Sequence, residues 1–358
     1  MSKYVENLNS EIRDYFSILS DDFPDWLLDY IETPEMQRLG KISLSCGTDY
    51  TDVFDIKYWY SNLEHSVGVA LIIWNFTHDK KQTLSGLFHD IATPAFKHVI
   101  DFLNNDHEKQ ESTEDKTTEI IKNSKHIMNL LKRDNIKLEE INDYKLYPIA
   151  DNDTPQLSAD RFEYTFSSGL TFYRVWDLNT IEECYKDVVV LKNEHGIDEL
   201  GFKNKDICEK YISIASGLWP QWITNADKTV MQFLADIIKI MIELEYITKE
   251  DLYNLSEEEI IETIINCEDN YISESFQKFQ NATNVYDSKI FGENKYCVSI
   301  NAKKRYVIPL VQFKESSRRI NQLSTKSKED IDSYLNFKTE KYSYFDFDFK
   351  PYKKRWIY

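Results

Sequence analysis

Glycine and proline are scarce in this chain, with nine glycines and eight prolines among 358 residues. A β-sandwich needs many turns and therefore more of both, so this composition favours long helices. The five cysteines stand far apart and form no CxxC pair, which is typical of reduced thiols in a cytoplasmic protein. We therefore expect a cytoplasmic, largely helical chain.

Long apolar runs are also missing. The longest, residues 67–74, contains a glycine and is far shorter than the roughly 18 residues that a membrane-spanning helix needs. The N-terminus lacks the charged-then-apolar pattern of a signal peptide. We therefore expect no membrane partner.

Basic residues are outnumbered, because 61 Asp and Glu stand against 43 Lys and Arg and give a net charge of −18. A surface this negative repels phosphate backbones, so we expect no nucleic-acid partner. It would also repel a small anionic substrate unless cations gather locally, as a bound metal ion or as clustered Lys and Arg. One basic segment, residues 303–328, is either a solvated face or a nucleotide contact, and both interpretations stay open.

The remaining composition is ordinary for a globular protein, with 42% hydrophobic and 29% charged residues. Helical patterns occur at residues 65–76, 81–90, 94–103, 207–219 and 226–247. The segments 296–300 and 305–313 look like two strands joined by a turn, which predicts a short β-hairpin. The length indicates two domains, or one helical body with a smaller unit.

We therefore expect a mainly α fold in two parts. Residues 1–200 would form a helical core that holds the functional site. Residues 201–358 would form a helical extension with a small β-containing C-terminal region, so that this second part is α+β.

Two histidines and two aspartates carry the strongest chemical signal. His65 lies in EHSVGVALIIW, the pair His89 and Asp90 lies in SGLFHDIA, and Asp160 follows a helix cap at Ser158. Imidazole and carboxylate suit Mn, Fe, Co, Ni or Zn ions. Four such ligands leave positions open for water and substrate, and an open site activates water and polarises a phosphoryl oxygen.

A second interpretation of these residues stays open on spacing alone. His89-Asp90 would then be a chance dipeptide, and His65 a core histidine. This second interpretation is disfavoured because burying charged side chains without a partner costs free energy. A bound metal ion would act as the partner of buried acids.

The ordered combination LEHSVGVA, GLFHDIATPAFKH, HEKQES and ADRFEY resembles the HD-domain phosphohydrolases, and most closely their deoxynucleoside triphosphate triphosphohydrolase branch. The resemblance covers residues 25–175, and KKRYVIPLV at 303–311 is similar to a later segment of such proteins. It implies an HD-domain helical bundle that holds one divalent ion (Mn, Fe, Mg, Co, Ni or Zn). The implied metal ligands are His65, His89, Asp90 and Asp160.

The resemblance also assigns catalytic roles. His98 would contact phosphate or help proton transfer, and Asp101, three residues away on the same helix face, would orient a histidine. His107 matches the family's catalytic histidine and could protonate the leaving oxygen, because imidazole titrates near neutrality. Two alternatives remain: His107 is a surface histidine, or His98 and His107 bind a second metal ion.

Four residues are candidates for substrate binding. Arg161 is forked and always charged, which suits a phosphate oxygen, and Tyr164 could pack on a sugar. The alternative is that Arg161 pairs with a neighbouring acid while Tyr164 belongs to the core. In the basic segment, Lys304 and Arg305 are further candidates.

Three departures from the family pattern weaken the assignment of a deoxynucleoside triphosphate. The triphosphatases often carry a second histidine where this chain has Thr93, and an arginine where it has Asn62. Their base-reading glutamine has no clear equivalent, because Leu44 falls near its place.

The sequence thus predicts a metal-dependent phosphohydrolase acting on a nucleotide or another phosphorylated small molecule, with a deoxynucleoside triphosphate as the best single substrate. The alternatives are a nucleoside monophosphate phosphatase or phosphodiesterase of the same fold, or a non-catalytic nucleotide sensor. By resemblance we expect a homo-oligomer, a dimer or higher.

Overall fold

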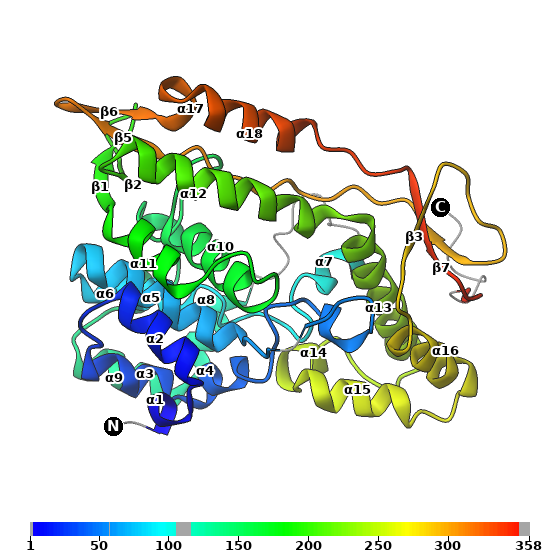
Figure 1. The fold of residues 1–358 in the computed structure, drawn as a ribbon. Coiled ribbons are helices and arrows are strands. Elements are labelled where there is room, and N and C mark those ends of the chain that lie inside the picture. The colour runs from blue at the N-terminus through cyan, green and yellow to red at the C-terminus, as the bar shows by residue number, and fades with distance from the viewer. Residues whose placement is uncertain (1–2, 57, 105–115, 351–358) are drawn as a thin grey trace.

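The computed structural model describes residues 3–56, 58–104 and 116–350 and is mainly helical, as Figure 1 shows. The helices of the first half are α1 (Lys3–Asn7), α2 (Ser10–Leu19), α3 (Asp25–Ile31), α4 (Pro34–Leu39), η1 (Thr48–Tyr50), α5 (Asn62–Thr77), α6 (Lys80–Phe88), α7 (Val99–Leu103), α8 (Thr117–Asn123), α9 (Lys125–Arg133), η2 (Leu138–Glu140), η3 (Tyr144–Leu146), α10 (Ala159–Thr171) and α11 (Leu178–Lys186).

The second half continues mainly in helices and adds most of the strands. Its helices are α12 (Lys205–Leu218), η4 (Trp219–Ile223), α13 (Asn225–Glu243), α14 (Asp251–Asn254), α15 (Glu257–Ile265), α16 (Asn270–Gln280), α17 (Ile320–Leu323) and α18 (Thr325–Asn336). The strands are β1 (Val188–Lys192), β2 (Asp198–Phe202), β3 (Tyr286–Ser288), β4 (Tyr296–Val298), β5 (Leu310–Phe313), β6 (Ser316–Arg319) and β7 (Tyr342–Phe345).

Helix α5 is the centre of the first half of the fold. A capping box starts it: Ser61 Oγ accepts the N–H of Glu64 (3.2 Å), and Glu64 accepts the N–H of Ser61 (2.6 Å). Beyond this cap most of its residues are buried, as expected for a helix that is apolar nearly all round. Helices α2, α4, α6 and α10 pack against it, so residues on these helices can meet at its N-terminal end.

Two hydrophobic clusters form the core. The first draws on α2 to α6 and α9 to α12 and extends to Tyr334 in α18. The second joins α7, α13, α15 and α16 to strands β4 and β7. Figure 1 shows the corresponding division, with α2 to α6 on the left of the view and α13 to α16 on the right. The clusters do not separate at residue 200, and the two-domain division stays a prediction.

The strands form two small sheets. One has the order β1-β2-β5-β6, in which only β2 and β5 run parallel, and the other has the antiparallel order β3-β7-β4. The hairpin expected between 296–300 and 305–313 is wrong, because β4 pairs with β7 whereas β5 pairs with β2 and β6. An alternating apolar pattern indicates a strand but does not specify its partner. The C-terminal hairpin is instead β5–β6.

Among the described residues, no helix is both long and apolar enough to cross a bilayer.

Candidate metal centre

Three helices bring the predicted ligands together. His65 lies near the start of α5, His89 caps the C-terminal end of α6 and is followed by Asp90, and Asp160 lies in the first turn of α10. Ser158 caps α10 as expected, because its Oγ accepts the N–H of Arg161 (3.3 Å). Since α6 and α10 both pack against α5, the four side chains converge although 95 positions separate the first from the last (160 − 65).

The distances among these side chains fit one metal ion. Nε2 of His65 lies 3.2 Å from Nε2 of His89 and 3.2 Å from Oδ1 of Asp160, and Nε2 of His89 lies 3.6 Å from the same oxygen. In His65, His89 and Asp160, one ligand atom from each residue lies within 4.8 Å of those from the other two. Atoms that bind one ion at about 2.0–2.2 Å stand roughly 3–4 Å apart. The donor set of two imidazoles and a carboxylate suits a first-row divalent ion.

A buried carboxylate orients the first of these imidazoles. Nδ1 of His65 donates a hydrogen bond to Oε2 of Glu163, which is fully buried and lies one helical turn after Asp160. Tyr60 (2.6 Å) and Tyr15 (3.3 Å) donate to Oε1, and Ser167 (3.1 Å) donates to Oε2. This network leaves Nε2 of His65 unprotonated for a metal, an arrangement common behind metal-binding histidines.

The second imidazole is oriented by backbone. Nδ1 of His89 donates to the carbonyl oxygen of Gly86 at 2.7 Å, so its Nε2 faces His65 and Asp160 as an acceptor. Both ligand histidines are therefore held in the tautomer that presents Nε2 to an ion.

The charges at the centre are those of a site that receives a cation. Burial alone lowers the pKa of His65, but the carboxylates of Glu163 and Asp160 outweigh it and raise that pKa to about 9. Burial alone raises the pKa of Asp160, but hydrogen bonds from His65 and His89 hold it well below its usual value. The carboxylates around the two imidazoles thus favour positive charge at this point, which is also what would favour a bound cation.

Asp90 stands apart from the other three because a lysine binds it. Its Oδ2 lies 3.8 Å from Nε2 of His65 and 3.6 Å from Nε2 of His89, and Nζ of Lys97 lies 2.6 Å away. The same ammonium donates to Oδ1 of Asn62 (2.8 Å). Burial alone raises the pKa of Asp90, but Lys97 and the two imidazoles hold it well below its usual value.

The backbone around Lys97 is unusual. Phe96 (φ 62°) and Lys97 (φ 47°) both adopt the left-handed conformation, which disfavours side-chain-bearing residues. The N–H of Phe96 donates to Oε1 of Glu257 (2.9 Å), a buried acid of α15. Helix α15 therefore helps hold the turn that aims the Lys97 ammonium into the centre.

Lys97→Met is expected to strengthen Mn²⁺ binding by about 10-fold, because it removes a buried like charge and releases Asp90 for coordination. Isothermal titration with Mn²⁺ measures this, and Lys97→Arg, which keeps the charge, is the matched control. Weaker Mn²⁺ binding in Lys97→Met would show instead that Lys97 only supports the local fold.

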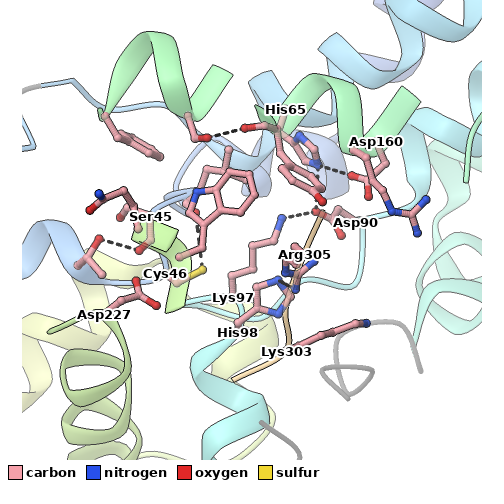
Figure 2. A pocket seen from close by; sticks show the side chains of 18 of the residues that line it. Ser45, Cys46, His65, Asp90, Lys97, His98, Asp160, Asp227, Lys303 and Arg305 are labelled. Atoms are coloured by element: carbon pink, nitrogen blue, oxygen red, sulfur yellow. Dashed lines mark hydrogen bonds and ion pairs between the residues drawn. The ribbon is translucent and has the colours of Figure 1, made fainter. Parts of the chain in front are cut away.

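The centre opens into a cavity of about 870 Å³, large enough for a nucleotide. Figure 2 shows His65, Asp90 and Asp160 on one side of it, with Lys97, His98, Lys303 and Arg305 facing the same space. The four predicted metal ligands line this cavity together with several cationic side chains. Local positive charge therefore exists in a chain of net charge −18.

His98 and Asp101 pair as the sequence predicted. Nδ1 of His98 donates to Oδ2 of Asp101 (2.9 Å), which is fully buried, and Nη2 of Arg305 donates to Nε2 of His98 (3.1 Å). Burial lowers the pKa of His98, although Asp101 acts in the opposite direction. In this arrangement a neutral His98 holds the guanidinium of Arg305 in the cavity.

Arg161 and Tyr164 both line the cavity, and Arg161 also has protein partners. Nη1 of Arg161 bonds Oδ1 of Asn152 (2.6 Å) and pairs with Asp151 (3.3 Å), which matches the alternative in which it binds a neighbouring acid. The ring of Tyr164 packs edge-on against Trp222. Their roles toward a substrate stay predictions.

Lys304 is described by the structure and does not line the cavity. Nζ of Lys304 donates to the carbonyl oxygens of Leu335 (2.6 Å) and Phe337 (2.9 Å), so it caps the end of α18, while its neighbours Lys303 and Arg305 line the cavity. The assignment of Lys304 to substrate is therefore corrected: in an extended segment, successive side chains point to opposite sides. His107 lies outside the described residues.

Two further residues of the centre, Glu163 and Lys97, were not predicted from the sequence. Glu163 follows Asp160 by three residues, so both project from one face of α10, and that spacing was a usable signal. Lys97 gave no such signal, because its direction depends on two successive left-handed residues.

No family model matches this chain. It is 24% identical over 235 residues to the uncharacterized protein YdhJ of Bacillus subtilis, a match that covers 65% of this chain and 69% of YdhJ. It is 26% identical over 152 residues to the metal-dependent phosphohydrolase cns2 of Cordyceps militaris, which covers 41% of each protein.

Two solved structures share the fold over most of their length. A hypothetical protein from Aquifex aeolicus superposes with a TM-score of 0.63 at 16% identity, covering 90% of this chain and 93% of that one. A phosphohydrolase from Bacteroides thetaiotaomicron superposes with a TM-score of 0.62 at 14% identity, covering 90% and 96%. The mainly helical fold is therefore one that a phosphohydrolase also has.

Proposed function

We propose that this chain is a metal-dependent phosphohydrolase of the HD type that acts on a nucleotide. The convergence of His65, His89 and Asp160 within 4.8 Å of one another, at the wall of a cavity with cationic side chains, carries the proposal. The name of cns2 as a metal-dependent phosphohydrolase supports the reaction class, and a structural neighbour called a phosphohydrolase supports the fold.

In such a reaction, different side chains would bind the metal ion, bind the phosphate and transfer protons. A divalent ion held by His65, His89, Asp160 and Asp90 would activate water and withdraw charge from a phosphoryl group. Lys303 and Arg305 would bind and orient phosphate oxygens, and Arg305 is suited to this by its planar fork. Since His98 accepts a hydrogen bond from Arg305, it positions that cation; His107 remains the candidate for protonating the leaving oxygen.

A deoxynucleoside triphosphate is the first substrate to test. A nucleoside monophosphate or a phosphodiester is the alternative within the same chemistry. The cavity is large enough for any of these three substrate classes. Thr93 and Asn62 depart from the triphosphatase pattern, which keeps the alternatives open. We further propose that the chain forms a homo-oligomer.

A nucleotide panel with Mn²⁺, Co²⁺, Ni²⁺, Zn²⁺ or Mg²⁺, analysed by chromatography, tests the reaction. We expect release of phosphate or triphosphate from at least one nucleotide, and complete loss of that release when a chelator removes the metal. Tight nucleotide binding without product under every metal would contradict the enzyme and favour a nucleotide sensor.

A further inference from the structure

The cavity has an end that the proposed reaction does not use. Figure 2 shows Asp227, with Ser45 and Cys46, on the opposite side of the view from Asp160, and Lys97 and His98 lie between them. Apolar and aromatic side chains also line the cavity, including Phe54, Phe172, Tyr173 and Met231. Lys97 thus separates Asp227 from the metal ligands in this view, and the apolar side chains of the lining leave space for an organic group.

Asp227 is the buried acid of this end. It is 9% exposed and lies in the first turn of α13, where Oγ1 of the cap residue Thr224 accepts its N–H (3.2 Å). Acids at the same helix position in α5 and α15 bond back to the N–H of the cap residue. Asp227 does not: among the residues that the structure describes, none donates a hydrogen bond to its carboxylate.

A carboxyl group that lines a cavity and has no donor from the protein is available to a donor on a ligand. Lys228 and Arg305 act on Asp227 only through their charge, and neither forms an ion pair with it. Burial raises the pKa of Asp227 to about 8, while these two cations act in the opposite direction. Whether protonated or ionised, the group keeps an oxygen that can accept a hydrogen bond.

We propose that Asp227 accepts a hydrogen bond from an N–H on the edge of a nucleobase, and that this contact, inside a cavity lined in part by apolar side chains, selects the organic part of the substrate. The inference rests on the proposed function, since it assumes that the cation-lined end takes the phosphate. A base is favoured over a sugar because a lining that includes Phe54, Phe172 and Tyr173 suits an aromatic ring better than a ring of hydroxyl groups.

Calorimetric titration of the metal-free protein with deoxyadenosine, deoxyguanosine, deoxycytidine and thymidine tests the contact. We expect at least one to bind, and Asp227→Leu to weaken that binding by about 10- to 100-fold. Asp227→Asn keeps an acceptor oxygen and is expected to restore most of the affinity. Unchanged binding in Asp227→Leu, or failure of all four nucleosides to bind, would overturn the inference.

Two controls separate a binding role from a structural one. Asp236 lies on the same helix, accepts hydrogen bonds from Tyr296 (2.7 Å) and Gln232 (2.9 Å), and does not line the cavity. Asp236→Asn is therefore expected to lower the melting temperature while leaving nucleoside affinity unchanged. Asp227→Leu is expected to keep its melting temperature, because it removes an unpartnered buried acid.

An abasic probe locates the contact on the base. Binding of 2-deoxyribose 5-phosphate in the presence of Mn²⁺ is expected to be equal in the wild type and in Asp227→Leu. If Asp227→Leu weakened binding of this probe as much as it weakens nucleoside binding, the assignment of the contact to the base would be overturned. Because nucleosides carry no phosphate, their binding does not depend on hydrolysis. Nucleoside binding without phosphate release would contradict only the proposed function, and phosphate release without nucleoside binding would contradict only this inference.

Discussion

Asp160→Ala is expected to abolish metal binding and to lower phosphate release by a factor on the order of 10³ or more. Oδ1 of Asp160 lies 3.2 Å from Nε2 of His65 and 3.6 Å from Nε2 of His89, which places it between the two imidazoles as a ligand. Without it, the two imidazoles and Asp90 remain, and the carboxylate of Asp90 is already paired with the Lys97 ammonium (2.6 Å). Two neutral nitrogens bind a divalent ion far more weakly than a set that includes a negatively charged oxygen.

The fold is expected to survive this change, which makes the result interpretable. Far-UV circular dichroism should be unchanged, because α10 keeps its Ser158 cap. Asp177→Ala is the matched control: Asp177 caps α11 at the surface through the N–H of Thr180 (2.9 Å) and lies outside the cavity. It should cost about 1 kcal/mol of stability and leave phosphate release intact. Full activity in Asp160→Ala would refute the proposed metal centre.

Glu163→Gln is expected to weaken Mn²⁺ affinity by about 10- to 100-fold. Its two carboxylate oxygens accept from Tyr15, Tyr60, Ser167 and Nδ1 of His65. An amide replaces one oxygen by an NH₂ group, which cannot accept from the donors that point at it. Either the two tyrosines or His65 and Ser167 then lose their acceptor, and His65 loses a carboxylate that fixes its tautomer.

Gly68→Ala would disturb the same hydrogen-bond network through a steric clash alone. A methyl group at Gly68 would stand 2.8 Å from both Cγ and Oε1 of Glu163, which its hydrogen bonds hold in place. We expect weaker Mn²⁺ binding and a lower melting temperature. Gly217→Ala in α12 is the matched control, because nothing lies within 4 Å of its added methyl, and it should be neutral or stabilising. Mn²⁺ affinity equal to the wild type in both Glu163→Gln and Gly68→Ala would show that His65 needs no support from Glu163.

The parts of the structure that local chemistry determines could be predicted from the sequence. The all-round apolar pattern of residues 65–76 predicted the buried helix α5, and Ser158 predicted the start of α10. Helical spacing placed His98 and Asp101 on one face, and the two side chains form a hydrogen bond in the structure. In each case the relevant residues lie within one helix or its cap.

The parts that depend on long-range packing could not be predicted from the sequence. Strands β4 and β5 were recognised as extended, but their partners β7 and β2 lie far along the chain. Lys304 and Arg305 are adjacent, yet one caps α18 and the other lines the cavity. The network around Glu163 joins residues from the N-terminal helix α2 to α10, so no local pattern could reveal it.

A crystal structure of the protein soaked in Mn²⁺, with anomalous scattering recorded at the manganese edge, tests the metal centre most directly. We expect one strong peak at about 2.0–2.3 Å from Nε2 of His65, Nε2 of His89 and a carboxylate oxygen of Asp160. A peak bound elsewhere, or none at saturating Mn²⁺, would contradict the proposed metal centre.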